Sequence, residues 1–206
     1  MKSLRQEFAD TVLELGSECE ELVVFVGDIS HGILQPFAKQ YPDRYYNIGI
    51  CEPTIVNMAA GLSMAGLIPV VHTIAPFLIE RSFEQIKLDF GYQNLGVNLI
   101  SVGGAFDYSK LGCSHHCYSD VALMSQLERA QIFLPGTASE FRQLFSSTFD
   151  DGMINYYRLT ENPHNVSIQP EMLSSGSAVR VIPGEDLTLA VVGSQLSNAF
   201  EVATEL

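Results

Sequence analysis

The chain has 206 residues, with 24 acidic against 11 basic side chains and a formal net charge of −13 at pH 7. This balance argues against a surface for nucleic acid or anionic lipid, because those partners are themselves negative. A hydrophobic content of 47% suffices for a packed core and excludes a disordered chain. No apolar run approaches the roughly 20 residues that span a bilayer, and residues 1–8 lack the apolar stretch of a secretory signal. We expect a cytoplasmic globular protein whose four cysteines do not form a disulfide scaffold.

Short apolar runs alternate with helical patterns along most of the chain. Residues 22–26 form a continuous β-branched and aromatic run, which is typical of a buried parallel strand. Further strands are expected at 45–48, 67–73, 97–102, 131–134 and 154–159, and helices at 4–15, 33–40, 53–65, 77–93, 118–127 and 138–149. Strands separated by such helices predict an α/β fold, a parallel twisted sheet with helices on both faces. Ligands of these sheets bind beyond the carboxyl ends of the strands.

The composition changes near residue 160 and again near residue 186. We expect a domain over 1–160, a linker rich in Pro, Ser and Gly over 161–185, and the beginning of another domain over 186–206. In that last segment, 187–193 predicts a buried strand and 194–205 its helix. Because one strand and one helix cannot bury a core of their own, we expect the chain to be a truncated version of a longer one.

Glu52 stands directly before Pro53 at the mouth of a predicted helix. One interpretation is that its carboxylate only complements the helix macrodipole. The other is that a half-buried carboxyl group holds or exchanges a proton with a ligand nitrogen. Local sequence alone leaves both interpretations open.

Other candidates follow predicted strands. Two histidines and two cysteines lie within 113–117 and suggest zinc, but the spacing fits poorly because a second ligand pair is needed. A histidine in such a loop can act as an acid–base group or as a hydrogen-bonding group. The alternative is a histidine at the start of a helix that only hydrogen-bonds the backbone. Phe77 and Phe83 are core or stacking aromatics, and Asp28 ends the first strand. No dinucleotide, P-loop, serine-hydrolase or zincin motif occurs in the sequence.

In chain order, these signals together resemble the pyrimidine-binding domain of the transketolase family of thiamine diphosphate enzymes. The segments that carry the resemblance are Gly27-Asp28, 47–52, 59–69, 73–85, 112–116 and 120–124. The resemblance covers about 4–159, and 185–206 is similar to the opening of the family's C-terminal domain.

The resemblance implies a role for each candidate residue. Glu52 matches the glutamate that hydrogen-bonds the aminopyrimidine ring nitrogen and favours the imino tautomer, which generates the thiazolium ylid. Phe77 matches the aromatic that stacks on the pyrimidine, and Phe83 a second aromatic of the same pocket. His115 matches the histidine that faces the thiazolium and the substrate oxygens, and Asp28 an aspartate near cofactor or substrate.

The sequence also departs from the family pattern. Gly103 and Gly104 stand where full-length transketolases carry a substrate-contacting histidine, and Glu80 stands at a third aromatic of the ring pocket. The Gly-Asp-Gly metal motif of the diphosphate-binding domain does not occur, so no metal ligand is assigned in this chain. The resemblance therefore implies that a separate N-terminal subunit holds the diphosphate and Mg²⁺, and that the chain self-associates.

The expected function is transfer of a two-carbon ketol unit between sugar phosphates, with this chain supplying the aminopyrimidine half of the site. A deoxyxylulose phosphate synthase-like enzyme and the β subunit of a 2-oxoacid dehydrogenase are alternatives within the cofactor class. A non-catalytic assembly or regulatory protein on the same fold is the alternative outside it.

Overall fold

The computed structural model describes residues 2–169 and 172–206, and its strands form one parallel sheet. The strands are β1 (Leu22–Val26), β2 (Tyr45–Asn47), β3 (Ile68–Ile74), β4 (Val97–Val102), β5 (Ala130–Phe133) and β6 (Ile154–Leu159). Their spatial order is β2-β1-β3-β4-β6-β5, and every neighbouring pair is parallel. The predicted α/β architecture is thereby confirmed.

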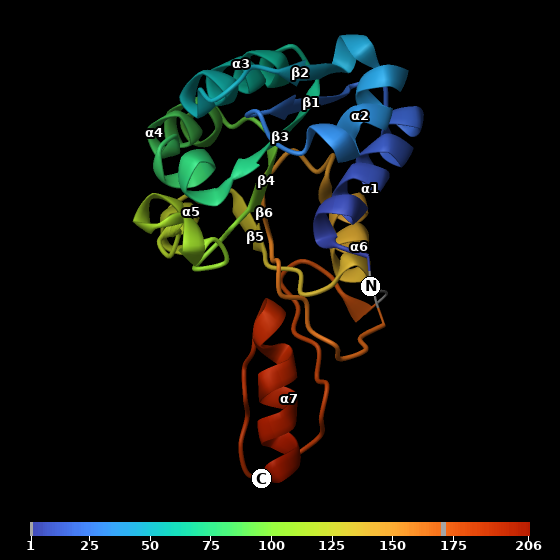
Figure 1. Cartoon of the computed structure of the whole chain (residues 1–206), viewed down its shortest axis with the longest axis vertical. Coiled ribbons are helices and arrows are strands. Elements are labelled where there is room, and N and C mark those ends of the chain that lie inside the picture. Colours follow the sequence, from blue (N-terminus) through green and yellow to red (C-terminus); the bar gives the residue numbers. More distant parts are fainter. Residues whose placement is uncertain (1, 170–171) are drawn as a thin grey trace.

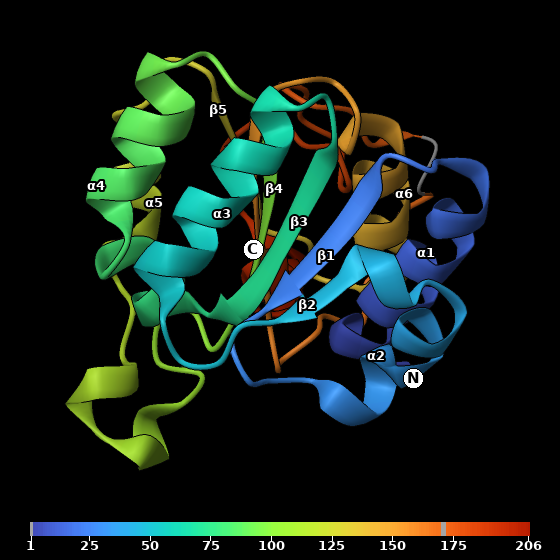
Figure 2. The ribbon, with the colours of Figure 1, turned by 90° about the horizontal axis from the view of Figure 1, so that it is seen from above.

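Helices cover both faces of the sheet (Figures 1 and 2). One face carries α1 (Leu4–Glu18), α2 (His31–Gln40) and α6 (Ala138–Thr148), and the other carries α3 (Glu52–Met64), α4 (Phe83–Gln85) and α5 (Asp120–Met124). Shorter helical segments are η1 (Pro42–Arg44), η2 (Pro76–Glu80), η3 (Ile86–Tyr92), η4 (Ser109–Leu111), η5 (Cys113–His115) and η7 (Gly193–Gln195), and the last helix is α7 (Leu196–Glu205).

The two cores explain why β1 has no polar position. Val24 and Val26 pack with Phe8 of α1 on one face, whereas Val23 and Phe25 pack with α3 on the other. Successive side chains of a strand point to opposite faces, so a strand covered on both sides is apolar throughout. Burying one such side chain contributes about 1.5–3 kcal/mol.

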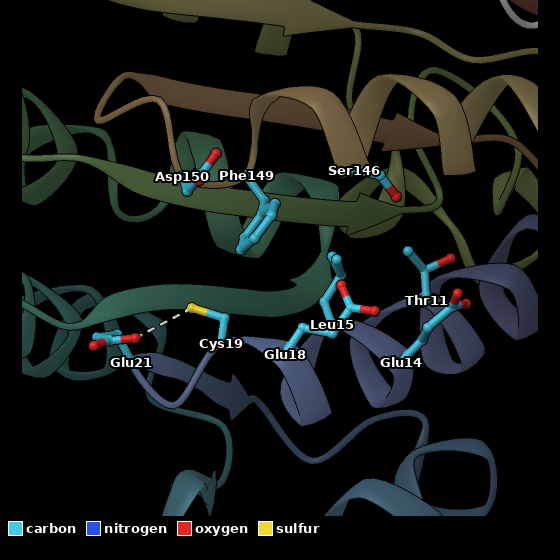
Figure 3. A pocket seen from close by; sticks show the side chains of 9 residues that line it. All are labelled: Thr11, Glu14, Leu15, Glu18, Cys19, Glu21, Ser146, Phe149 and Asp150. Carbon is cyan, nitrogen blue, oxygen red and sulfur yellow. Dashed lines mark hydrogen bonds between the residues drawn. The ribbon is translucent and has the colours of Figure 1, made fainter.

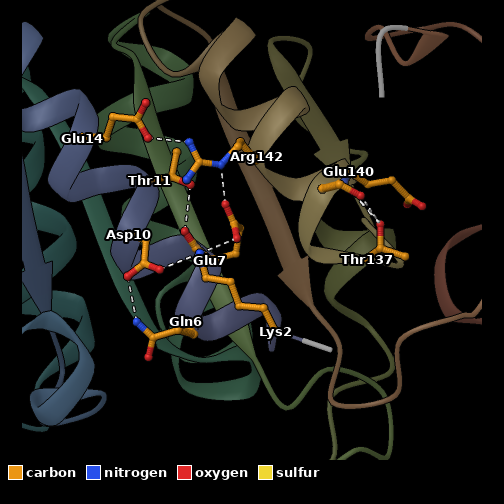
Figure 4. Close-up of polar contacts among 10 residues, drawn as sticks. Lys2, Gln6, Glu7, Asp10, Thr11, Glu14, Thr137, Glu140 and Arg142 are labelled. Carbon is orange, nitrogen blue, oxygen red and sulfur yellow. Dashed lines mark hydrogen bonds and ion pairs between the residues drawn. The ribbon is translucent and has the colours of Figure 1, made fainter. Parts of the chain in front are cut away.

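Ion pairs link α1 to α6 at the edge of one core (Figure 4). Arg142 donates hydrogen bonds to Glu7 and to Glu14, the latter at 2.5 Å, and Lys2 Nζ lies 2.6 Å from Glu7. Burial raises the pKa of Glu7, but the hydrogen bonds from Lys2 and Arg142 outweigh it and bring the pKa below its usual value. Glu7 is thus held as a carboxylate between two helices.

The segment predicted as one helix over 77–93 is divided in the structure. The amide of Arg81 donates to the carbonyl of Pro76 at 3.0 Å, which makes η2 a wide π turn, and Ser82 then leaves helical geometry at φ −110° and ψ 13°. The Ser82 hydroxyl donates to the carbonyl of Phe77 at 3.2 Å, a bond that competes with the backbone ladder. Short π segments inside helices recur at functional sites.

The prediction of a strand at 187–193 was wrong. The helix predicted at 194–205 forms as α7, with nearly the same bounds. Residues 187–192 have no regular structure, because no strand among the described residues pairs with them. The segment after β6 meets the sheet domain at His164, whose amide donates to Gly136 and whose Nε2 lies 2.6 Å from Glu140 Oε1. Beyond it α7 extends away from the sheet (Figure 1). No helix in the described ranges is long and apolar enough to cross a membrane.

Candidate functional site

The predicted site residues lie on the loops that follow the strands. Asp28 follows β1, Glu52 follows β2, Phe77 follows β3 and His115 follows β4. Parallel neighbours end at the same edge of a sheet, so these four loops share one edge.

Glu52 is the first residue of α3, and its side chain is 1% exposed. Its Oε2 accepts a hydrogen bond from Arg81 Nη1 at 2.7 Å. A carboxylate removed from water needs such a partner, because an unpaired buried charge is strongly unfavourable. Glu52 is therefore a buried acid with a definite hydrogen-bond partner, and proton exchange with a ligand nitrogen stays a prediction.

Arg81 also contacts Phe77. The centre of its guanidinium lies 4.2 Å from the centroid of the Phe77 ring, a cation–π contact on the face of an aromatic that is only half-buried. One guanidinium thus joins the buried acid to the aromatic. The sequence interpretation did not include Arg81, although an arginine four residues after an aromatic in a helical segment comes close to it.

His115 completes the cluster. Its ring meets the Phe77 ring edge to face, with 5.2 Å between centroids, and its Nδ1 lies 3.1 Å from Ser114 Oγ. Glu80, next to Arg81, accepts a hydrogen bond from Ser119 and further ties the two loops together. The structure thus brings Glu52, Phe77 and His115 into one chain of contacts through Arg81.

Asp28 lies apart from this cluster. It has φ 56°, is exposed, and accepts hydrogen bonds from His31 Nε2 at 2.8 Å and from Asn47 Nδ2 at 3.4 Å. These hydrogen bonds hold the pKa of Asp28 below its usual value, and the bond from His31 has the larger effect. Asp28 is therefore an ionised acid at the same edge, and its role stays a prediction.

Phe83 is the first residue of α4 and is half-buried. It packs against the core between the sheet and α3, together with residues such as Ile86. Among the described residues, no aromatic contact joins Phe83 to Phe77. Its placement is that of a core aromatic at the rim of the cluster.

The residues of 113–117 diverge rather than converge. Cys113 is exposed, whereas Cys117 is buried, and burial raises the pKa of the Cys117 thiol so that it stays neutral. Over 2–169 and 172–206, no three side chains of His, Cys, Asp or Glu gather closely enough to hold a metal ion. The zinc alternative has no geometric support in these residues.

Gly103 and Gly104 are required by what surrounds them. A Cβ on Gly103, which has φ +70°, would lie 2.3 Å from the Tyr108 ring, and one on Gly104 would lie 2.1 Å from Arg158 Cδ. Arg158 is itself fixed, because its Nη1 donates to buried Asp120 at 3.1 Å. Any side chain at either position would therefore have to displace Tyr108 or Arg158.

A hollow of about 560 Å³ lies at the other edge of the sheet (Figure 3). It is next to the amino ends of the strands, since Cys19 and Glu21 precede β1 and Asp150 precedes β6. Glu14, Glu18, Glu21 and Asp150 line it, and these acids would repel an anionic ligand. We therefore place the candidate site at the Glu52 edge.

The Glu52 cluster suits a planar aromatic ligand with nitrogen atoms in its ring. The carboxylate of Glu52 can accept a hydrogen bond from a ring N–H, and the Phe77 face can stack on the ring. His115 at the edge of Phe77 can donate to or accept from the next group along the ligand.

Comparison with known proteins identifies the family of the chain. A family model described as the transketolase pyrimidine binding domain matches residues 1–155. The chain is 39% identical over 137 residues to an apulose-4-phosphate transketolase subunit of Actinobacillus succinogenes, and the match covers 66% of this chain and 42% of that protein. It is 28% identical over 206 residues to 1-deoxy-D-xylulose-5-phosphate synthase of Syntrophomonas wolfei, covering 98% of this chain and 32% of that protein.

A solved structure described as a split gene transketolase, inactive beta4 tetramer, superimposes with a TM-score of 0.86 at 29% identity. The match covers 98% of this chain and 66% of that one. The chain therefore spans less than half the length of the two curated relatives above and about two thirds of this structure.

Proposed function

Because this chain belongs to the transketolase family through its pyrimidine-binding domain, we propose that it supplies the aminopyrimidine half of a thiamine diphosphate site. The reaction would be transfer of a two-carbon ketol unit between sugar phosphates. The observation that carries the proposal is the buried carboxylate of Glu52 close to the half-buried ring of Phe77, with Arg81 in contact with both and His115 at the ring's edge.

The residues present fit the aminopyrimidine of the cofactor. Glu52 would accept the hydrogen bond of a ring nitrogen and hold the shared proton out of water, where solvent cannot remove it. Phe77 would stack on the ring, and Phe83 would close the pocket behind it. The bound cofactor would supply a carbanion that attacks the sugar carbonyl.

His115 would act on the substrate side. Its ring is fixed by Phe77 and Ser114, so a nitrogen can be directed at the substrate's oxygens, where protons must move as the carbonyl is attacked. Asp28 would contact cofactor or substrate from the β1 loop as an anion.

The other half of the site would come from a partner. We propose a separate N-terminal subunit that holds the diphosphate and Mg²⁺, together with self-association of this chain. The names of the relatives support this arrangement, since one is named as a subunit of a transketolase and another as a split gene transketolase tetramer. The proposed compartment is the cytoplasm, where the free thiols of Cys19, Cys51, Cys113 and Cys117 stay reduced.

Sugar phosphates are the proposed substrates because the relatives act by name on apulose 4-phosphate or make deoxyxylulose 5-phosphate. Because one of these relatives is named as a deoxyxylulose phosphate synthase, the synthase alternative also remains open. The substitution of glycines at 103 and 104 for the family's histidine favours a substrate different from that of full-length transketolases.

The test is reconstitution. The chain would be coexpressed with a subunit that carries a Gly-Asp-Gly metal motif and assayed with thiamine diphosphate, Mg²⁺, a ketose phosphate donor and aldose phosphate acceptors. We expect ketol transfer by the complex and none by either subunit alone. Consumption of pyruvate would favour the synthase or dehydrogenase alternative. A complex that assembles but neither binds the cofactor nor turns over would contradict the proposal and favour an assembly role.

A further inference from the structure

We propose that the Arg81 side chain competes with the cofactor for the aminopyrimidine site and must leave when the cofactor binds, an inference that rests on the function proposed above. The cofactor ring and the Arg81 guanidinium would compete for the same carboxylate oxygen and the same aromatic face. Arg81 would thus be a built-in competitor of the cofactor.

The contacts of Arg81 are those that the cofactor ring would need. Its Nη1 donates to Glu52 Oε2 at 2.7 Å, and its guanidinium lies over the Phe77 ring at 4.2 Å. A guanidinium is planar, delocalised and rich in N–H donors, as is the protonated edge of an aminopyrimidine. The two groups therefore satisfy the same acceptor and the same π face, and they cannot do so together.

Exposure gives the direction of approach. The Glu52 side chain is 1% exposed and the Arg81 side chain 44%. The arginine therefore lies on the solvent side of the carboxylate, and a ligand that approaches Glu52 from that side must displace it.

The local backbone makes this displacement feasible. Arg81 ends the η2 turn, where its amide is held by Pro76 and the following Ser82 is buried. The backbone stays fixed by these contacts while the long, half-exposed side chain swings out through its own rotamers. No other element has to unfold.

The competition has a measurable cost for the cofactor. Arg81 compensates the buried charge of Glu52, and breaking that charge-assisted hydrogen bond lowers the apparent affinity for the cofactor. Substituting Arg81 removes the competitor, so Arg81→Leu should bind thiamine diphosphate more tightly than the wild type. We expect a gain of about tenfold in affinity, the factor set by one charged hydrogen bond.

The experiment measures binding rather than turnover, by calorimetry of thiamine diphosphate with Mg²⁺ on the reconstituted complex. Lys87→Leu is the matched control, because Lys87 is exposed on neighbouring η3 and its loss also removes one positive charge. Arg81→Lys keeps the charge without the planar fork and should give an intermediate affinity. It also covers the case in which Arg81→Leu fails to fold.

The outcomes separate the two proposals. Tighter binding by Arg81→Leu, with Lys87→Leu unchanged or weaker, supports the competitor. Equal or weaker binding by Arg81→Leu or Arg81→Lys, while the wild-type complex binds normally, overturns it and leaves the proposed function standing. If neither the wild type nor the Arg81 variants bind, the proposed function fails and the competitor with it.

Discussion

The imidazole of His115 stands edge to face against the ring of Phe77, with 5.2 Å between their centroids. The two residues belong to loops after different strands, β4 and β3, so this contact fixes one loop against the other. A single aromatic side chain therefore contacts the imidazole at the ring's edge and the Arg81 guanidinium on its face. If the proposed cofactor ring stacks on Phe77, its binding will be coupled to the position of the imidazole.

Phe77→Ala should weaken thiamine diphosphate binding by the reconstituted complex, because stacking is lost. Such aromatic contacts are worth about 0.5–1.5 kcal/mol beyond the area they bury. Calorimetry gives the affinity, and the NMR shift of the His115 ring reports the loosened imidazole. Phe106→Ala is the control, since exposed Phe106 pairs with His116 and Tyr118 outside the cluster. Equal losses in both variants would count against a stacking role for Phe77.

Glu52→Gln should lower kcat of the reconstituted complex by about 10²- to 10⁴-fold, the range for loss of a general acid–base group. Glutamine keeps the size and the hydrogen bond but cannot hold the proton. Steady-state kinetics measures the loss, and circular dichroism checks that the variant folds. Glu84→Gln, an exposed acid on α4, should keep the wild-type rate. An active Glu52→Gln enzyme would refute the proposed role.

His72 should make stability depend on pH. Burial lowers the pKa of His72 to about 4. The hydrogen bond to the Ile100 carbonyl raises the pKa, but by less than burial lowers it. The neutral ring satisfies both neighbours, because Nδ1 donates to Ile100 at 2.9 Å and Nε2 accepts from Ser30 at 2.8 Å. Between pH 6.5 and 4 the unfolded chain binds more protons, so the free energy of unfolding falls as the pH falls.

The free energy of unfolding falls by about 2 kcal/mol between neutral pH and pH 5, and the stabilisation by the neutral ring is complete only well above pH 6.5. Urea unfolding at pH 5, 6 and 7 should therefore show a steeper slope for the wild type than for His72→Gln, which has no titrating ring. Carboxylates contribute to both proteins alike, so the difference isolates His72. Parallel slopes would show that His72 does not titrate in this way.

Gly104→Ala should destabilise the chain by about 1–3 kcal/mol, the usual cost of overpacking. The new Cβ would lie 2.1 Å from Arg158 Cδ and push that side chain away from buried Asp120. The measurement is the urea midpoint of unfolding. Gly61→Ala is matched to it, because nothing lies within 4 Å of its Cβ and alanine favours the α3 helix. Comparable effects at both positions would contradict the crowding at Gly104.

Strands between two layers of helices were the most predictable elements. The bounds of β1, β4 and β6 agree with the apolar runs at 22–26, 97–102 and 154–159, because burial on both faces leaves few polar residues inside them. Of the helix predicted over 118–127, only α5 (Asp120–Met124) forms. The residues after it form tighter turns, in which the amides of Gln126 and Leu127 donate to carbonyls three residues earlier.

The candidate site could be predicted residue by residue but not as a set of contacts. Glu52, Phe77 and His115 were named in the sequence, and they lie in one cluster. Arg81, which connects Glu52 to Phe77, was missed because its contact with Glu52 joins residues 29 positions apart, although its spacing from Phe77 is a local helical signal. Asp28 was predicted too, but its side-chain hydrogen bonds go to His31 and Asn47 and not to the residues of the cluster.

The loop between β4 and α5 has its two ends, at Ala105 and Cys117, next to each other. Ala105 and Cys117 exchange two backbone hydrogen bonds, of 2.6 and 2.9 Å, which hold the two ends of this loop together. Insertions or deletions inside such a loop leave the flanking strand and helix where they are. The length and sequence of this loop can therefore change while Glu52 and Phe77, on the neighbouring loops, keep their places.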